Sequence, residues 1–305
     1  MKLTTTVPVK TLTNLIDYQS KVTLLGSCFT ENIGNKLAYY GFDVVVNPFG
    51  IVFNSTSIKL LVKRAVKNQA FTLEDCTSHF SYLVHSDLND NDPKQLLKNL
   101  NNGLEKLQIA LKNSTHLFIT LGTAWVYRNL EKNMIVANCH KQPQHLFKKE
   151  LLDIEEISFD QEEIYNLVKT VNPSISITYT LSPVRHIKDG FVENQRSKAR
   201  LHEAIQSQVD QNKAHYFPAY EIAMDELRDY RFYSRDMVHL NEVAIDFIWS
   251  RFRESGINKN TLPQQKAVEK YRKLSHHRPT DTLSHEVKLK QMREKLIEQF
   301  PKTQL

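Results

Sequence analysis

Hydrophobic residues gather in short runs that alternate with longer segments of mixed apolar and polar residues. Five short runs have the composition of β-strands, and they span residues 22–25, 42–46, 116–121, 175–181 and 215–218. Between them, apolar residues recur near the 3.6-residue period of helices, over residues 31–40, 57–67, 92–111, 160–170, 197–212 and 242–253. This alternation predicts an α/β fold in which a parallel sheet carries helices on both faces.

Two further segments, residues 71–92 and 128–157, are polar and long for simple connections. We expect both to run over the surface, where long loops near strand ends are commonly functional. In an open parallel sheet, ligands bind beyond the carboxyl ends of the strands. The residues that follow each strand are therefore the first place to look for chemistry.

The end of the chain differs from the rest in charge. The formal net charge is +6, and from Gly256 onward 11 Lys and Arg residues stand against 5 Asp and Glu residues, so residues 1–255 are neutral overall. Residues 262–277 and 283–300 have helical periodicity. We expect an α/β domain over residues 1–255 and a basic helical extension over residues 256–305.

An apolar stripe runs along the second helix of this extension. It consists of Leu289, Met292, Leu296 and Phe300. We expect the stripe to pack on the core or on a second copy of the chain in a homodimer. Lysines at helical spacing in the first helix are typical of a solvated face, and no nucleic-acid-binding motif occurs, so we expect no nucleic-acid partner.

Composition excludes several classes of protein. Mean hydropathy is −0.44, and no apolar run approaches the length of a membrane span. The first ten residues lack the apolar core of a secretory signal, and three cysteines give no disulfide framework. We therefore expect a cytoplasmic protein without a membrane partner. There is no phosphate-binding glycine loop or metal-ligand cluster, so we expect neither a cofactor nor a metal.

The first strand leads directly into a sharp turn with a nucleophilic side chain. Gly26, Ser27 and Cys28 follow the apolar run and precede a helical segment. The positive end of a helix and its free N–H groups should lower the pKa of a thiol at this position. Cys28 is the first candidate nucleophile; the alternatives are a small buried hydrophobic role for Cys28 or a nucleophilic Ser27.

A second constellation follows the last predicted strand. Asp236 stands three residues before His239, just ahead of a helical segment. An Asp at this spacing can accept a hydrogen bond from one imidazole nitrogen while the other faces a nucleophile. Asp236 as a helix cap and His239 as polar surface are the alternatives. His186 and His140 also lie near strand ends and compete as the base.

These residues carry a family resemblance. The segment Gly26-Ser27-Cys28-Phe29-Thr30 resembles the signature of the GSCFA family, a branch of the SGNH/GDSL hydrolase superfamily. The match continues in the same order through residues 47–51, 120–124, 138–141, 182–186 and 230–239. The resemblance implies a three-layer α/β/α domain with a mostly parallel, flavodoxin-like sheet of five strands, and chemistry on ester bonds.

The resemblance also implies roles for individual residues. The superfamily nucleophile falls on Cys28, its catalytic pair on Asp236 and His239, and its glycine oxyanion donor on Gly50. The asparagine donor is replaced by Ala124, so another group must supply that hydrogen bond, with Thr123, Trp125 and Asn138 as candidates.

The expected activity is that of a hydrolase or acyltransferase acting on a small-molecule or carbohydrate-linked acyl ester. Arg185 would hold an anionic group of the substrate, or would pair with a neighbouring carboxylate. Ala124, and the absence of an acid at position 27, favour an alternative, a catalytically weak binding or regulatory module with the same fold. An interaction protein that works through its basic tail is a third possibility.

Overall fold

A five-stranded parallel sheet forms the centre of the molecule, which we describe from a computed structural model covering residues 4–305. Its strands are β1 (Lys21–Gly26), β2 (Asp43–Val46), β3 (His116–Leu121), β7 (Ser176–Leu181) and β8 (His215–Phe217). Their spatial order is β2-β1-β3-β7-β8, and every neighbouring pair is parallel. This is the flavodoxin-like order. Successive strands are added on one side of β1 as far as β2 and on the other side from β3 onward, so the order reverses between β1 and β3. The predicted fold class is confirmed.

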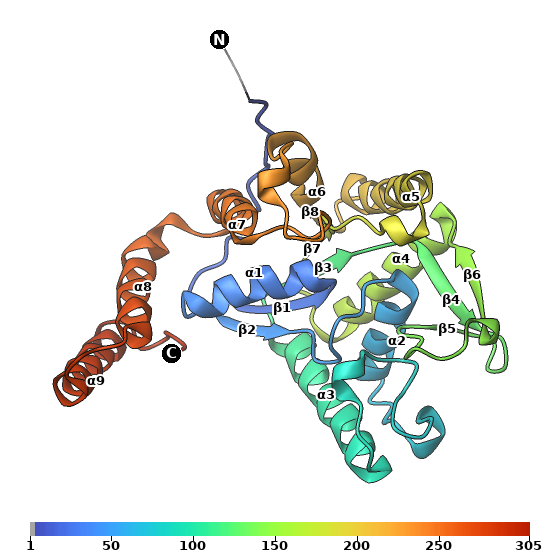
Figure 1. The fold of residues 1–305 in the computed structure, drawn as a ribbon, viewed down its shortest axis with the longest axis horizontal. Coiled ribbons are helices and arrows are strands. Elements are labelled where there is room, and N and C mark those ends of the chain that lie inside the picture. The colour runs from blue at the N-terminus through green and yellow to red at the C-terminus, as the bar shows by residue number, and fades with distance from the viewer. Residues whose placement is uncertain (1–3) are drawn as a thin grey trace.

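Helices cover both faces of this sheet, as Figure 1 shows. One face packs against α2 (Ser55–Val66), α3 (Pro93–Asn113), α4 (Ile154–Val171) and α5 (Phe191–Asp210). The other packs against α1 (Cys28–Tyr39), the short α6 (Ala219–Glu221) and α7 (Glu242–Gly256). Alternation along the strands builds both cores: Leu117, Ile119 and Leu121 face the first group, whereas Phe118 between them faces the second.

A second, smaller sheet corrects one prediction. Residues 128–157, expected as an excursion over the surface, contain two strands and the end of a third in an antiparallel sheet formed by β4 (Trp125–Asn129), β5 (Met134–Val136) and β6 (Phe147–Leu151), in the order β5-β4-β6. The strands are short, and β6 carries the adjacent exposed residues Lys148 and Lys149, so the hydrophobic signal is weak. This sheet stands beside the carboxyl end of β3 and forms one wall of the site described below.

The C-terminal helices α8 (Leu262–His276) and α9 (Thr282–Gln299) project from one side of the molecule (Figure 1). The apolar stripe of α9 packs against Val268 and Tyr271 of α8 rather than on the central core, and its packing on a second copy stays a prediction. The tail then returns to the main body, where the Gln304 N–H donates to the Gly41 carbonyl at 2.9 Å.

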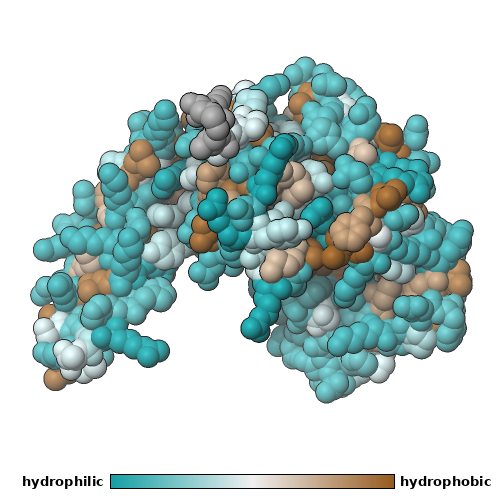
Figure 2. Space-filling view, turned by 45° about the horizontal axis from the view of Figure 1, so that its top comes forward, coloured by the Kyte–Doolittle hydropathy of each residue, from teal (hydrophilic) through white to brown (hydrophobic). Residues whose placement is uncertain are grey.

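The surface is predominantly hydrophilic, with brown apolar residues in small groups on the face that Figure 2 presents. Among the described residues, no helix combines the length and the apolar character needed to cross a bilayer.

Candidate functional site

The turn between β1 and α1 brings Cys28 to the carboxyl edge of the sheet. Gly26 has a φ of +138°, and a Cβ atom there would lie 2.3 Å from the Thr120 carbonyl oxygen of β3. Only glycine fits this close approach of two strands. The Ser27 N–H donates to the same carbonyl at 3.2 Å, and α1 begins with Cys28. The β1–α1 turn is thus fixed on the central strand.

Burial raises the pKa of the Cys28 thiol, with a smaller contribution from the negative charge of Glu31. This corrects the expectation that the helix N-terminus would lower it. Three groups act in the opposite direction: the backbone N–H groups of Phe29 and Cys28, and the charge of Lys198. Desolvation of a thiolate exceeds their combined effect because the sulfur is half-buried.

Lys198 is the unexpected residue of the site. Its side chain on α5 is almost completely buried, and its Nζ donates at 2.7 Å to the carbonyls of Gly122 and Ser182, the residues that follow β3 and β7. Burial lowers the pKa of its ammonium to about 7, against a smaller opposing effect of Cys28. A sequence signal existed, because Lys198 shares the helix face of Leu201, Ile205 and Gln208, which are all buried.

Asp236 and His239 form the predicted pair. The His239 Nδ1 and the Asp236 Oδ2 are 2.6 Å apart, and the other carboxylate oxygen accepts the backbone N–H groups of Val238 and His239 at 3.0 Å. The hydrogen bonds from His239 and the backbone hold the pKa of Asp236 at about 2. Because an ionised Asp236 accepts the Nδ1 proton, the Nε2 of a neutral His239 is left as a proton acceptor.

Both residues line a cleft of about 710 Å³ beyond the carboxyl ends of β3 and β7. We call it the large cleft; among its lining residues are Phe53, Asn54, Thr123, Trp125, His186 and His239. It exceeds the cavity of about 600 Å³ beside β2, and it lies where an α/β sheet is expected to bind its ligand.

Arg185 and His186 also line the large cleft, as expected for residues that follow β7. The His186 ring packs against Phe53 in a tilted arrangement, with the ring centroids 5.3 Å apart. Burial lowers the pKa of His186 to about 4, and the positive charges of Lys198 and His239 contribute in the same direction. His186 is therefore neutral at pH 7.

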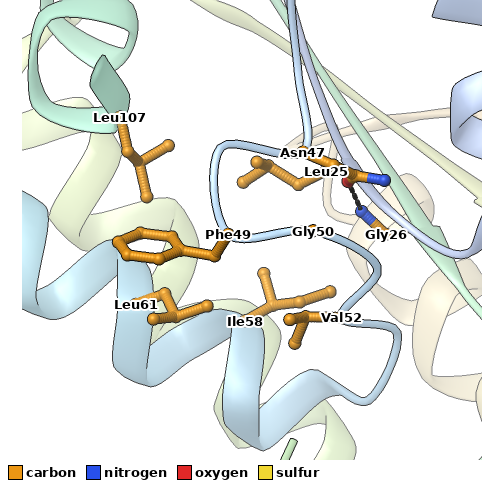
Figure 3. A pocket seen from close by; sticks show the side chains of 9 residues that line it. All are labelled: Leu25, Gly26, Asn47, Phe49, Gly50, Val52, Ile58, Leu61 and Leu107. Carbon is orange, nitrogen blue, oxygen red and sulfur yellow. Dashed lines mark hydrogen bonds between the residues drawn. The ribbon is translucent and has the colours of Figure 1, made fainter. Parts of the chain in front are cut away.

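Gly50 lies away from the large cleft. It lines a cavity of only about 10 Å³ behind β1, together with Gly26 and Asn47, whose Oδ1 accepts the Gly26 N–H at 2.9 Å (Figure 3). The Gly50 N–H donates to the Asn47 carbonyl at 2.8 Å. The expected oxyanion donor is thus engaged in a turn in this structure.

The other candidate donors differ in position. Thr123 lines the large cleft, but its Oγ1 accepts the Trp125 N–H at 3.0 Å and lies 2.9 Å from the Ser197 Oγ. Asn138 does not line the cleft, and its Oδ1 accepts the N–H of His140 at 2.8 Å.

Two alternative catalytic groups are buried or engaged elsewhere. His140 stacks on Phe80 and its Nε2 lies 2.8 Å from the Ser81 carbonyl, so it belongs to a small core cluster. The Ser27 hydroxyl is buried without a hydrogen-bond partner among the described residues.

Asn54 is a further residue that the sequence did not indicate. It caps the N-terminus of α2, where its Oδ1 accepts the Ser57 N–H at 2.8 Å. The residue is 4% exposed and lines the large cleft, and its Nδ2 donates to no protein group in residues 4–305. With its oxygen fixed, Asn54 can present an N–H donor to a ligand.

Cys28, Lys198, His186 and His239 gather at one edge of the sheet. The charge of Lys198 lowers the pKa of both Cys28 and His186, and the charge of His239 lowers the pKa of His186. No hydrogen bond joins the Cys28 sulfur to the His239 ring in the described part of the chain, and Cys28 does not line the cleft. Hydrogen bonds of this kind are often loose in unliganded sites.

Comparison with known proteins places the chain in a family. A search of curated proteins found no match. A crystal structure aligns over 77% of this chain and 95% of its own, at 11% identity and a TM-score of 0.39, a likeness too low to support an argument. A model of the GSCFA family, in contrast, matches residues 21–252, which include the sheet, the large cleft, Cys28 and the Asp236–His239 pair. The chain therefore belongs to the GSCFA family.

Proposed function

We propose that this protein hydrolyses or transfers an acyl group from an ester by a cysteine–histidine–aspartate mechanism, and that its family is a branch of the SGNH/GDSL hydrolases. The observation that carries the proposal is the 2.6 Å Asp236–His239 contact at the edge of the large cleft, on the same side of the sheet as the start of α1. A carboxylate-oriented imidazole beside a nucleophile is the arrangement that covalent acyl transfer requires.

In the first step, the His239 Nε2 takes the proton of Cys28 as the sulfur attacks the ester carbonyl carbon. Asp236 stabilises the imidazolium that forms and keeps the ring in one orientation. The tetrahedral intermediate collapses when the carbon–oxygen bond of the ester breaks. The alcohol leaves with the proton from His239, and the acyl group remains on Cys28 as a thioester.

Two other groups must donate hydrogen bonds to the oxyanion, in place of Gly50 and of the asparagine that Ala124 replaces. The Cys28 N–H is in the first turn of α1, where it has no helical acceptor. Asn54 supplies a side-chain donor to the large cleft from a fixed position. We assign the two oxyanion contacts to these groups, because Gly50 is engaged in a turn and residue 124 is alanine.

In the second step, water or an acceptor alcohol attacks the thioester. His239 removes its proton and then returns one to the thiolate as the carbon–sulfur bond breaks. Lys198 favours the leaving thiolate through its charge, which opposes the effect of burial on Cys28.

Mass spectrometry with p-nitrophenyl acetate tests the covalent step. We expect an acetyl adduct on the Cys28 peptide of the wild type and of the matched control Cys76→Ala, and none at this position in Cys28→Ala. An adduct that is retained in Cys28→Ala but lost in Ser27→Ala would identify Ser27 as the nucleophile. No adduct on either residue, with no release of p-nitrophenol, would reject the mechanism.

A binding or regulatory module is the second candidate function. It is favoured by Ala124 in place of an oxyanion donor and by burial, which raises the pKa of Cys28. A panel of activated esters separates the candidates, since a module would occupy the large cleft with a ligand but would not turn any ester over.

A further inference from the structure

The large cleft carries a positive charge without a protein partner. Its charged lining residues besides the histidines are Arg185, Lys188, Asp189 and Asp236. Both acids have partners: Asp189 forms an ion pair with the Nζ of Lys149 at 2.5 Å, and Asp236 accepts a hydrogen bond from His239 at 2.6 Å. Within residues 4–305, neither Arg185 nor Lys188 contacts a carboxylate within 4.0 Å.

Arg185 is the more informative of the two cations. Lys188 is exposed to solvent, whereas Arg185 is half-buried in the wall of the cleft. A guanidinium that is partly removed from water interacts more strongly with an anion than an exposed one does. Its planar fork also matches the two oxygens of a carboxylate or a phosphate.

The remaining wall of the cleft is largely apolar. It is formed by Phe53, Trp125, Val126, Tyr127, Val184 and Ile187. The position of Trp125 is fixed, because its indole N–H donates to the Glu193 carbonyl at 3.1 Å and Lys149 lies 4.7 Å over its ring. An apolar wall beside a cation without a carboxylate partner favours ligands that combine hydrophobic carbon with a negative group.

We infer that the substrate is an ester with an apolar portion that fills the large cleft and an anionic carboxylate or phosphate that binds Arg185. This inference rests on the proposed function and adds the chemical class of its substrate. Arg185 acts in it as a specificity-determining residue that touches the substrate away from the reacting carbon. The neighbouring His186 is neutral at pH 7, so it adds no competing charge.

Rates with matched esters test the inference. The neutral reference is p-nitrophenyl butyrate. The anionic probes are mono-p-nitrophenyl glutarate, charged on the acyl side, and the butyryl ester of 3-hydroxy-4-nitrobenzoate, charged on the leaving-group side. We expect kcat/KM for one anionic probe to exceed that of the neutral ester by roughly tenfold or more. Arg185→Gln should bring the ratio of the two kcat/KM values close to one. Arg293→Gln on the exposed α9 is the matched control and should leave the ratio unchanged.

Binding without turnover separates this inference from the proposed function. Fluorescence of Trp125 should report binding of pentanoate or butyl phosphate, and comparison of the two identifies which oxyanion is preferred. Binding that is weakened at least about tenfold by Arg185→Gln supports anion recognition even if no ester is cleaved. A ratio near one in the wild type, or equal ligand affinities in wild type and Arg185→Gln, would overturn the inference.

Discussion

Replacing Gly26 by alanine should break the turn that presents Cys28. The added Cβ would lie 2.3 Å from the carbonyl oxygen of Thr120 and 2.8 Å from its nitrogen, and both are backbone atoms of the central strand β3. These atoms cannot rotate away as a side chain would. To relieve the contact, β1 must separate from β3 at the end that carries the site.

The cost has three parts. Separation of the strands weakens the Ser27–Thr120 hydrogen bond of 3.2 Å and the neighbouring ladder contact, at about 1 kcal/mol each. A φ of +138° adds about 1–2 kcal/mol for any residue with a Cβ. Residual overpacking contributes about 1 kcal/mol or more. Gly26→Ala should therefore lower the free energy of unfolding by about 4–5 kcal/mol.

Urea unfolding followed by tryptophan fluorescence measures this loss, and Gly256→Ala is the matched control. A Cβ at Gly256 would meet its nearest neighbours, Leu12 and Phe252, at 3.5 Å, which is ordinary contact. Alanine at this helical position should be neutral or should stabilise the protein by up to about 1 kcal/mol. If Gly26→Ala unfolds within about 1 kcal/mol of the wild type, the described β1–α1 turn is incorrect.

Three further predictions concern the pair, the buried lysine and the core. Asp236→Asn should slow acylation by on the order of a hundredfold or more because it removes the acceptor that orients His239. Stopped-flow release of p-nitrophenol measures the acylation rate. An unchanged rate would exclude the pair from the mechanism. Lys198 releases its proton near pH 7 in the folded protein but near 10.5 when unfolded, so it makes stability rise with pH between about 7 and 9. Urea titrations at the two pH values should show a smaller rise in Lys198→Met, and an equal rise would argue against a depressed pKa. Leu100→Ala, in the buried face of α3, should cost about 2–5 kcal/mol in the same assay, compared with a negligible effect of Leu283→Ala on exposed α9.

Much of the fold could be predicted because each central strand has a strong local signal. The predicted strand over residues 116–121, for example, coincides with β3. Every side chain of this strand is buried, so its residues form a clear apolar run in the sequence. The second sheet was missed because Phe147–Leu151 places two adjacent exposed lysines among partly buried residues, without the alternation typical of a strand, which also suits a surface loop. Its pairing with Trp125–Asn129 depends on contacts between segments that are distant in the sequence.

The site was predictable where spacing alone sets the geometry. The three-residue interval between Asp236 and His239 indicated a paired carboxylate and imidazole, and the structure shows the two side chains 2.6 Å apart. The state of the Gly50 N–H was not predictable, since it depends on a turn to Asn47, and burial reversed the expected direction of the Cys28 pKa. Lys198 escaped notice because lysine is ordinarily a surface residue, and only its place among buried helix positions distinguishes it.

The exposure of the histidine bears on the choice between hydrolysis and transfer. The side chains of Asp236 and His239 remain 50% and 52% accessible, so bulk water reaches the proton acceptor without any movement of the chain. If a thioester forms beside such a solvent-accessible imidazole, water is the molecule that would ordinarily attack it. An acceptor alcohol could compete only by shielding His239 with its own bulk, so efficient transfer would require a large acceptor, whereas small alcohols would divert little of the acyl group.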